Sequence, residues 1–427
     1  MGRIASLTLI LTLALALALA AGCRSRSLPA SGPIRIGVVL PQSGGLAEDG
    51  QAWVRGVRLA AAEVNAAGGL LGGRRVELLV VDSATDSMAG VNGAIEVLDQ
   101  GAAVVIGDGG SGGSLAIYEM VTQAAAVPQI SGSATSTSLT TANGMLAVGE
   151  RYFFRTAPPD NYQAQIVDRI TTMHASCTSL AVLYQDDAYG APLGMEIARL
   201  FGMHGTVTST LAFPPAQPSY ATETTMIAAS TPDCVALVAY PQDAGIILRN
   251  WRDGAHPSVQ WIGTDGLFSA DFISEAGSDM LVTGFFGASP LTTPDTPEFH
   301  DFAARYHAAY GHDPENFVSS YYDATALALL AIQQAGTTDG AMVRDALRQI
   351  GGPGGTRVQR AAALRDALTE LTSATPRPIN YQGASGPINF DELGNTVAPY
   401  AIWQITGMPA TFSTVAVVQA ADLMTGP

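Results

Sequence analysis

Short apolar segments alternate with segments of helical periodicity along this chain, and this alternation limits the fold more than any other feature. Residues 34–40 (IRIGVVL) are apolar and rich in β-branched side chains, which predicts a buried strand. In residues 51–66 the apolar side chains recur at helical spacing, and Gly68 and Gly69 follow, which predicts a helix that ends there. Strands that alternate with helices form parallel sheets, so the sequence predicts an α/β fold.

The alternating pattern occurs twice in tandem, with the paired prolines of residues 154–160 (FRTAPPD) between the copies. Each copy predicts a doubly wound unit with a parallel sheet. The first predicts strands at 34–40, 76–81, 103–106 and 128–131 and helices at 51–66, 89–100 and 114–126. The second predicts strands at 179–184, 206–213, 235–240 and 259–263 and helices at 162–174, 192–203, 221–229 and 243–253.

The glycine-rich turn after the third strand, within residues 102–114 (AAVVIGDGGSGGS), is compatible with three different functions. A strand that leads through a turn into a helix presents free N–H groups and the positive end of the helix dipole, so we expect an anion there. Gly107-x-Gly109-x-x-Gly112 fits a dinucleotide-binding fingerprint, and Gly109-x-Ser111-x-Gly113 fits the nucleophile elbow of a hydrolase. The third function is to hold the carboxylate of a small ligand that is bound and not transformed.

The surrounding sequence favours the third function. A dinucleotide site needs an acidic residue about 20 positions after the glycines, and residues 125–139 contain none. A secreted serine hydrolase that uses Ser111 would need an acid and a histidine later in the chain, and its elbow would lie on only the third strand. The available residues are Asp265 with His300, His307 or His312.

Composition excludes several kinds of chemistry. All 21 cationic side chains are arginine, so the chain lacks the lysine that a P-loop, a Schiff base or pyridoxal phosphate requires. The net charge of −16, without a basic cluster, argues against nucleic acid as a partner. The histidines show no metal-ligand spacing. We therefore expect no cofactor, no metal and no enzymatic activity.

The first 22 residues predict export. Arg3 precedes the apolar run 7–21, which ends in small residues directly before Cys23, as in a signal peptide. The small residues and the cysteine resemble the lipidation site of bacterial lipoproteins, which implies cleavage before Cys23 and a diacylglyceryl anchor on its thiol. Residues 23–32 would then form a tether, and the protein would lie in the periplasm or at the cell surface, attached to the membrane.

Two cysteines remain after lipidation, Cys177 and Cys234, and each lies just before or at the start of a predicted strand. A single remaining pair in an exported protein favours a disulfide. The first and third strands of a doubly wound unit are neighbours, so both cysteines would lie at the same end of adjacent strands.

A second set of polar residues follows other strand ends. In residues 130–135 (ISGSAT), Ser133 and Thr135 come after a strand, so they should share one crevice with Ser111, because open α/β sheets bind ligands beyond the carboxyl ends of their strands. The second copy places two aromatic rings and a carboxylate at its strand ends: Tyr189, Tyr240 and Asp265. Hydroxyls for an anion and a carboxylate with rings for a cation together describe a site for a zwitterionic amino acid.

At these residues the sequence resembles the periplasmic branched-chain amino acid-binding proteins of ABC importers. The resemblance runs in order through IRIGVVLPQSG, NAAGGLLGGRRVELLVVD, VVIGDGGSGGS, ISGSATS, QDDAYG, WIGTDG and GPINFDELGN. It implies a type I periplasmic-binding-protein fold, in which two doubly wound parallel-sheet lobes are joined by three crossovers near 154–160, 283–290 and 382–387. Lobe 1 would comprise 33–156 and 287–384, and lobe 2 would comprise 157–286 and 385–427.

The resemblance also implies a role for each site residue. Ser111 and Thr135 would hold the α-carboxylate of the ligand. The backbone oxygen of Ser133, in the turn that includes Ala134, would accept a hydrogen bond from the ammonium, and Asp265 would pair with that ammonium. Tyr189 and Tyr240 would close over the ligand.

Three positions depart from the family. Asp49 stands where the family often has an aromatic residue, so the pocket for the ligand side chain should be more polar than a leucine site. Asp265 stands where a glutamate is common. Thr85 and Gly110 occupy the places of a disulfide found in some members.

The expected function is that of a monomeric substrate-binding lipoprotein. It would capture a small amino acid, of the branched-chain type or a related one, and deliver it to the membrane permease subunits of an ABC importer. The alternative is a sensor that presents a ligand such as an amide, urea or an aromatic acid to a membrane receptor.

Overall fold

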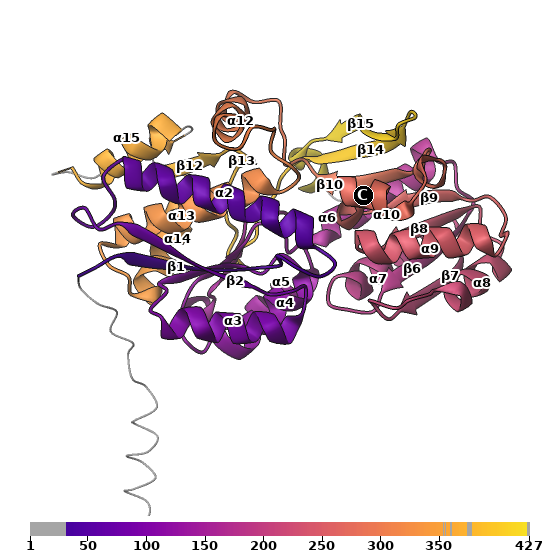
Figure 1. Cartoon of the computed structure of the whole chain (residues 1–427), viewed down its shortest axis with the longest axis horizontal. Coiled ribbons are helices and arrows are strands. Elements are labelled where there is room, and N and C mark those ends of the chain that lie inside the picture. Colours follow the sequence, from indigo (N-terminus) through magenta and orange to yellow (C-terminus); the bar gives the residue numbers. More distant parts are fainter. Residues whose placement is uncertain (1–30, 353, 355, 359–360, 374–377, 425–427) are drawn as a thin grey trace, which may run out of the picture. The chain divides into compact units, whose positions relative to one another are not determined.

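The first strand–helix series forms a five-stranded sheet in the order β2-β1-β3-β4-β5 (Figure 1). All its neighbouring strands are parallel, as predicted, but β5 is not one of the four predicted strands, since it overlaps the segment predicted as a crossover. The structure is a computed structural model, and it describes residues 31–427 except 353, 355, 359–360, 374–377 and 425–427. The predicted signal peptide, Cys23 and most of the predicted tether lie outside the described residues. The strands are β1 (Ile34–Leu40), β2 (Val76–Asp82), β3 (Val104–Gly107), β4 (Gln129–Ser131) and β5 (Phe153–Arg155).

Helices cover both faces of this sheet, with α2 and α13 on one face and α3 and α4 on the other (Figure 1). The helix predicted at 51–66 begins four residues earlier, because the acidic residues Glu48 and Asp49 suit the positive end of a helix. The helix predicted at 114–126 begins at Ser111 and continues into a π-helical turn. The bounds are α2 (Ala47–Ala66), α3 (Ser87–Asp99), α4 (Ser111–Ile117), η1 (Tyr118–Thr122), α5 (Thr137–Gly144), η2 (Val148–Glu150) and α13 (Val318–Ala335).

The second series forms a seven-stranded sheet in the order β15-β14-β10-β9-β8-β6-β7. Strands β6 to β10 are parallel to one another, whereas β14 runs antiparallel to β10. Strand β15 runs antiparallel to β14, since a short turn at 407–410 joins them. The strands are β6 (Ser179–Gln185), β7 (Thr206–Phe213), β8 (Cys234–Val238), β9 (Gln260–Gly263), β10 (Phe286–Pro290), β14 (Tyr400–Thr406) and β15 (Thr411–Val418).

One hydrophobic core lies on each face of the second sheet, the first under α6 and α7 and the second under α9 and α10.

Strand β10 begins one residue before the predicted lobe boundary at 287 and belongs to this second sheet. The lobe boundaries themselves stay a prediction. The helices are α6 (Asp160–Arg169), η3 (Ile170–His174), α7 (Gly190–Phe201), α8 (Ala221–Ala229), α9 (Pro241–Asp253), η4 (Asp265–Leu267), α10 (Ala270–Ala276), α11 (Asp279–Val282) and α16 (Ala420–Met424).

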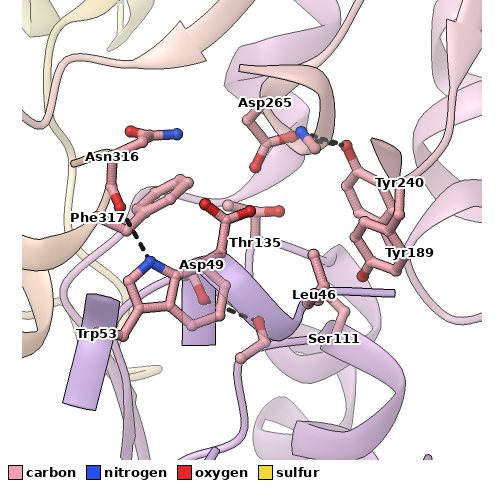
Figure 2. A pocket seen from close by; sticks show the side chains of 13 residues that line it. Leu46, Asp49, Trp53, Ser111, Thr135, Tyr189, Tyr240, Asp265, Asn316 and Phe317 are labelled. Atoms are coloured by element: carbon pink, nitrogen blue, oxygen red, sulfur yellow. Dashed lines mark hydrogen bonds between the residues drawn. The ribbon is translucent and has the colours of Figure 1, made fainter. Parts of the chain in front are cut away.

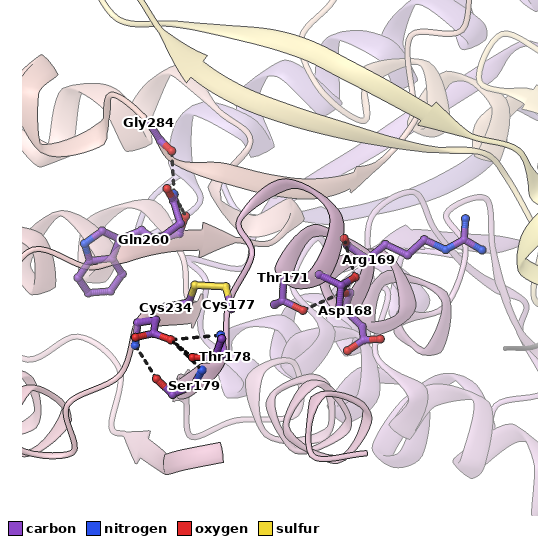
Figure 3. The surroundings of a disulfide bond; sticks show 12 residues. Asp168, Arg169, Thr171, Cys177, Thr178, Ser179, Cys234, Gln260 and Gly284 are labelled. Atoms are coloured by element: carbon purple, nitrogen blue, oxygen red, sulfur yellow. Dashed lines mark hydrogen bonds between the residues drawn. A yellow bond between two sulfur atoms is a disulfide. The ribbon is translucent and has the colours of Figure 1, made fainter. Parts of the chain in front are cut away.

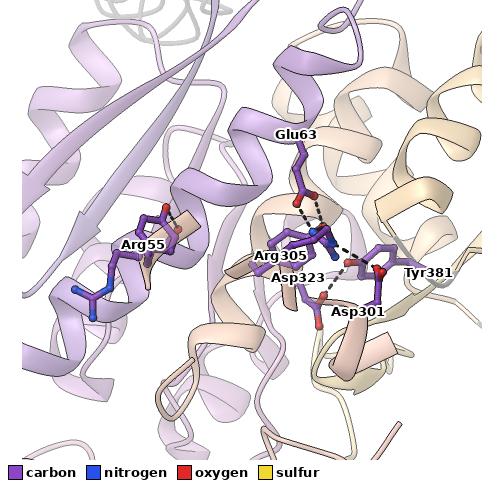
Figure 4. A network of polar contacts seen from close by, with 8 residues as sticks. Arg55, Glu63, Asp301, Arg305, Asp323 and Tyr381 are labelled. Atoms are coloured by element: carbon purple, nitrogen blue, oxygen red, sulfur yellow. Dashed lines mark hydrogen bonds and ion pairs between the residues drawn. The ribbon is translucent and has the colours of Figure 1, made fainter. Parts of the chain in front are cut away.

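A third, small sheet in the order β11-β12-β13 lies near α13. Polar contacts fix this region: Glu63 on α2 pairs with Arg305 on α12, and Asp323 on α13 accepts hydrogen bonds from Tyr381 (2.7 Å) and Ser385 (2.6 Å) (Figure 4). These bonds set the position of α13. The remaining elements are α12 (Pro297–Tyr310), α14 (Gly340–Ile350), β11 (Thr356–Val358), α15 (Ala361–Leu371), β12 (Ile379–Gly383) and β13 (Gly386–Pro387).

The predicted disulfide is confirmed. Cys177 and Cys234 are bonded, with their Cα atoms 5.9 Å apart (Figure 3). Cys234 begins β8, Cys177 precedes β6, and these strands are neighbours. Beside the disulfide, Asp233 accepts hydrogen bonds from Thr178 and Ser179, and these bonds lower the pKa of its carboxyl group.

In the described part of the chain no helix is both long enough and apolar enough to cross a membrane.

We expect the double variant Cys177→Ser/Cys234→Ser to lose about 4 kcal/mol of unfolding free energy, because the bond closes a loop across a sequence separation of 57. Urea denaturation of the chain from Gly32 onward, which excludes Cys23, measures this loss. Reduction of the parent protein should produce the same loss, which serves as the control. Two free thiols in the unreduced, denatured parent would contradict the assignment.

Candidate functional site

The strand order places the loops of both sheets around one cavity. In β2-β1-β3 and in β7-β6-β8 the two later strands lie on opposite sides of the earlier one, and the helices after β1 and β3, like those after β6 and β8, cover opposite faces of the sheet. Loops at such a reversal separate and form a crevice. The cavity has about 370 Å³ of free space, part of it open to solvent. It is lined by Leu46, Asp49, Trp53, Gly109, Ser111, Ser133, Thr135, Tyr189, Tyr240, Asp265, Gly266, Asn316 and Phe317 (Figure 2).

Ser111 is the first residue of α4 and lines the cavity. Its Oγ accepts a hydrogen bond from the backbone N–H of Ser136 (3.2 Å), which leaves its own proton for a ligand. The hydrogen-bond ladder of the helix begins with the N–H of Ser114, which donates to the Gly110 carbonyl (2.9 Å). The N–H groups that precede Ser114 in α4 are therefore not used by the helix, and they strengthen the attraction for an anion.

The glycine pattern of this turn has a packing cause. A Cβ at Gly109 would lie 2.2 Å from the ring of Trp53, so only glycine lets that ring pack against the turn. Gly107 has a φ of +130°, a conformation that disfavours any side chain. Close packing and backbone geometry thus explain these glycines without a dinucleotide or a nucleophile elbow.

The second predicted turn places two hydroxyl groups at the cavity. Ser133 Oγ donates to the Gly109 carbonyl (2.8 Å) and contacts the Tyr321 hydroxyl (2.9 Å), so it ties the two turns together. Thr135 Oγ1 is buried at the cavity beside the carboxyl group of Asp160, and its hydroxyl can turn toward a ligand. Ala134 is also buried but does not line the cavity, and its carbonyl accepts a hydrogen bond from Arg155 (3.2 Å).

The opposite wall carries the predicted aromatic pair and the carboxylate. The Tyr189 hydroxyl donates to Asp265 Oδ1 (2.7 Å) and accepts from the N–H of Gly266 (3.2 Å), so it fixes the carboxylate (Figure 2). Tyr240 stacks on Tyr189, with the ring centroids 5.2 Å apart. A Cβ at Gly110 would lie 3.4 Å from the Tyr240 hydroxyl, so this ring reaches the turn that precedes Ser111.

The site is strongly acidic. Burial raises the pKa of Asp265, and burial together with the charge of Asp265 raises the pKa of Asp160. Burial, followed by the charges of Glu315 and Glu48, raises the pKa of Asp49 to about 7. The lining named above contains two carboxylates and no cationic side chain, so the cavity favours a positive group on its ligand.

Several lining residues were missed by the sequence analysis. Trp53 is predicted only as a core residue of a helix, yet one end of its ring borders the cavity while the indole N–H donates to the Asn316 carbonyl (2.9 Å). Asn316 and Phe317 lie in no motif, and they reach the site because α13 packs against α2. Leu46 precedes the helix by one residue.

The three histidines considered for a hydrolase lie outside the cavity lining. His300 contacts Asp295 (2.7 Å), and His307 contacts Asp313 (2.9 Å), both at the surface. His312 contacts the backbone of Asp313 (3.0 Å). None of them can therefore serve as a base for Ser111 in this structure.

Comparisons with known proteins agree with the fold and with a binding site. A family model described as periplasmic binding protein matches residues 33–407. The chain is 27% identical to the chemotactic signal transduction system substrate-binding protein BasB of Halobacterium salinarum, over 88% of each chain. It is 27% identical to the Leu/Ile/Val-binding protein BraC3 of Rhizobium johnstonii, over 73% of this chain and 82% of that protein. The leucine binding protein LivK of Thermotoga maritima superposes with a TM-score of 0.76 at 21% identity, over 91% of this chain and 99% of that chain.

We expect the ligand-free protein to lose stability as the pH rises from about 4 to about 7. Burial raises the pKa of Asp49 and of Asp108 to about 7, so the folded state binds more protons than the unfolded state across this range, and stability must fall. Thermal unfolding at a series of pH values measures the slope. Asp49→Asn should make it shallower, and a melting temperature that rises between pH 5 and pH 8 would contradict the prediction.

Proposed function

The chain belongs to the periplasmic binding protein family, and from this premise we propose that it is a substrate-binding lipoprotein for a small amino acid. Members of this family act outside the cytoplasm. We propose that the protein captures its ligand in the cavity described above and delivers it to the membrane permease subunits of an ABC importer. The observation that carries this proposal is the pairing of free hydroxyl donors on one wall with a fixed, buried carboxylate on the other.

The two walls match the two ends of an α-amino acid. Ser111 and Thr135 have hydroxyl protons available for the α-carboxylate, and the unused N–H groups at the start of α4 add to that attraction. Asp265 would pair with the ammonium, together with the backbone oxygen of Ser133. Charge-assisted hydrogen bonds of this kind are strong where water is excluded.

The geometry supports binding rather than catalysis. A serine nucleophile needs an adjacent base, and the Ser111 hydroxyl is instead held by the backbone N–H of Ser136. The described residues that line the cavity include no histidine. The alternative of a serine hydrolase therefore has no support in the site.

A sensory role is the stronger alternative. The similarity to a substrate-binding protein of a chemotactic signal transduction system extends over 88% of this chain. A protein that presents its ligand to a membrane receptor needs the same two walls as one that serves a transporter. Amides, urea and aromatic acids remain alternative ligands for such a receptor.

We expect Cys23→Ser to release the protein from the membrane fraction, because the proposed lipid anchor requires the thiol of Cys23. Fractionation of cells that express the parent and the variant measures this change. Substitution of Ser25, two positions further along, serves as the control and should leave the protein in the membrane. Continued membrane association of the Cys23 variant would refute the anchor.

We expect Asp265→Ala to weaken amino acid binding by about 30-fold to several thousand-fold, because the ammonium of the ligand would lose its partner in a desolvated site. A thermal-shift screen against amino acids identifies the ligand, since one at 100 times its Kd adds about 2.7 kcal/mol of stability. Calorimetry then compares the parent with the variant.

The control for this experiment is Asp186→Ala, which removes an exposed carboxylate after β6 that does not line the cavity. It should bind as the parent does. If Asp265→Ala binds the same amino acid as tightly as the parent, the ammonium assignment is wrong and a ligand without an amine becomes the better candidate.

A further inference from the structure

We propose that the end of the cavity beside Asp49 binds a cation, so that the ligand is a small basic amino acid whose side chain carries an ammonium or a guanidinium group. This inference rests on the proposed function, because it takes the α-carboxylate and α-ammonium of the ligand to be bound by Ser111, Thr135 and Asp265.

Asp49 is placed to meet the side chain of the ligand. It lies in the first turn of α2 and lines the cavity, and Figure 2 shows its carboxylate pointing inward beside Trp53 and Phe317. No hydrogen bond or ion pair satisfies this carboxylate within the described part of the chain. An acidic residue in the first turn of a helix also favours the helix dipole, but the neighbouring Glu48 already supplies that charge from an exposed position.

The charge balance of the cavity calls for a second positive group. The lining holds the carboxylates of Asp49 and Asp265 and no cationic side chain. A ligand with a neutral side chain has one ammonium, which Asp265 would take, and it would leave Asp49 enclosed without a partner. Enclosing an unpaired carboxylate is costly, whereas pairing it with a cation offsets much of that cost.

The groups around Asp49 add to this negative field. Glu48 and Glu315 both raise the pKa of Asp49, and Asp271 on α10 faces the same group of acids. Arg55 lines an adjoining cavity together with Asp49, and it is bound to Glu315 (2.6 Å) and to the Tyr306 hydroxyl (2.9 Å). Since that arginine is already paired, a cation for Asp49 has to come with the ligand.

The walls beside Asp49 are aromatic and rigid. Trp53 stacks on Tyr321 at 5.1 Å between centroids and meets Phe317 edge to face at 6.4 Å. Both Trp53 and Phe317 are buried. Aromatic faces attract cations and also pack against the methylene groups that carry them. A carboxylate between such rings therefore suits the end of a lysine or arginine side chain.

Calorimetry on the purified mature protein at pH 8, where Asp49 is mostly ionised, tests the inference with L-lysine, L-arginine, L-leucine and L-glutamine. Lysine or arginine should bind at least about 30-fold more tightly than leucine or glutamine, as expected for a desolvated charge pair. Asp49→Asn should weaken binding of the basic amino acid by at least about 30-fold without weakening leucine or glutamine. Asp49→Leu should reverse the preference toward leucine.

Asp186→Asn is the matched control, because it makes the same change of side chain at an exposed position outside the cavity lining. Its affinity for the basic amino acid should change by less than about fivefold. Leucine or glutamine binding as tightly as the basic amino acids would overturn the inference and leave the proposed function intact. Equal weakening of all ligands in Asp49→Asn would also overturn it. Failure of the parent to bind any amino acid would refute the proposed function itself.

Discussion

The reversal of strand order in each parallel sheet is the constraint on which the site depends. The helices that follow the neighbouring strands β1 and β3 lie on opposite faces of their sheet, and so do those that follow β6 and β8, so the loops after these strands must separate. Ser111 follows β3, Asp49 follows β1, Tyr189 follows β6 and Tyr240 follows β8. These four residues are therefore brought together by sheet topology, although they are far apart in the sequence.

A second layer of polar contacts holds these loops in place. Arg155 is buried at the end of β5, and it donates to the carbonyls of Ala134 and Ser136 and to the side chain of Asn395. Burial lowers the pKa of Arg155 to about 10, which still leaves it charged at neutral pH. The arginine thus fixes the turn that carries Thr135, through the carbonyls on either side of Thr135. Ala134 belongs to this support, since its carbonyl points to the arginine and not to the cavity.

Much of this arrangement could be predicted from the sequence, because periodicity locates strands and a general rule places ligands at their carboxyl ends. The glycines and hydroxyls of the two turns and the residues Tyr189, Tyr240 and Asp265 all lie at such ends. Phe317 could not be found in this way. It enters the site through the packing of α13 on α2, a contact between segments more than 250 residues apart that no local pattern encodes. The antiparallel pair β14-β15 was likewise not predicted, since nothing in the alternating pattern specifies an added hairpin at the sheet edge.

The elements that bind the common part of an amino acid are separate from those that would select its side chain. The α-carboxylate and α-ammonium groups would meet residues at strand ends, whose positions follow from the sheets themselves. The side chain would meet Asp49 on the first turn of α2 and Phe317 at the start of α13, which can change without disturbing the strands. Because the two sets lie on different elements, one fold can keep its affinity for the α-carboxylate and α-ammonium groups while its preference for the ligand side chain changes. In this chain, the carboxylate of Asp49 would turn that preference toward a positive charge, as we propose.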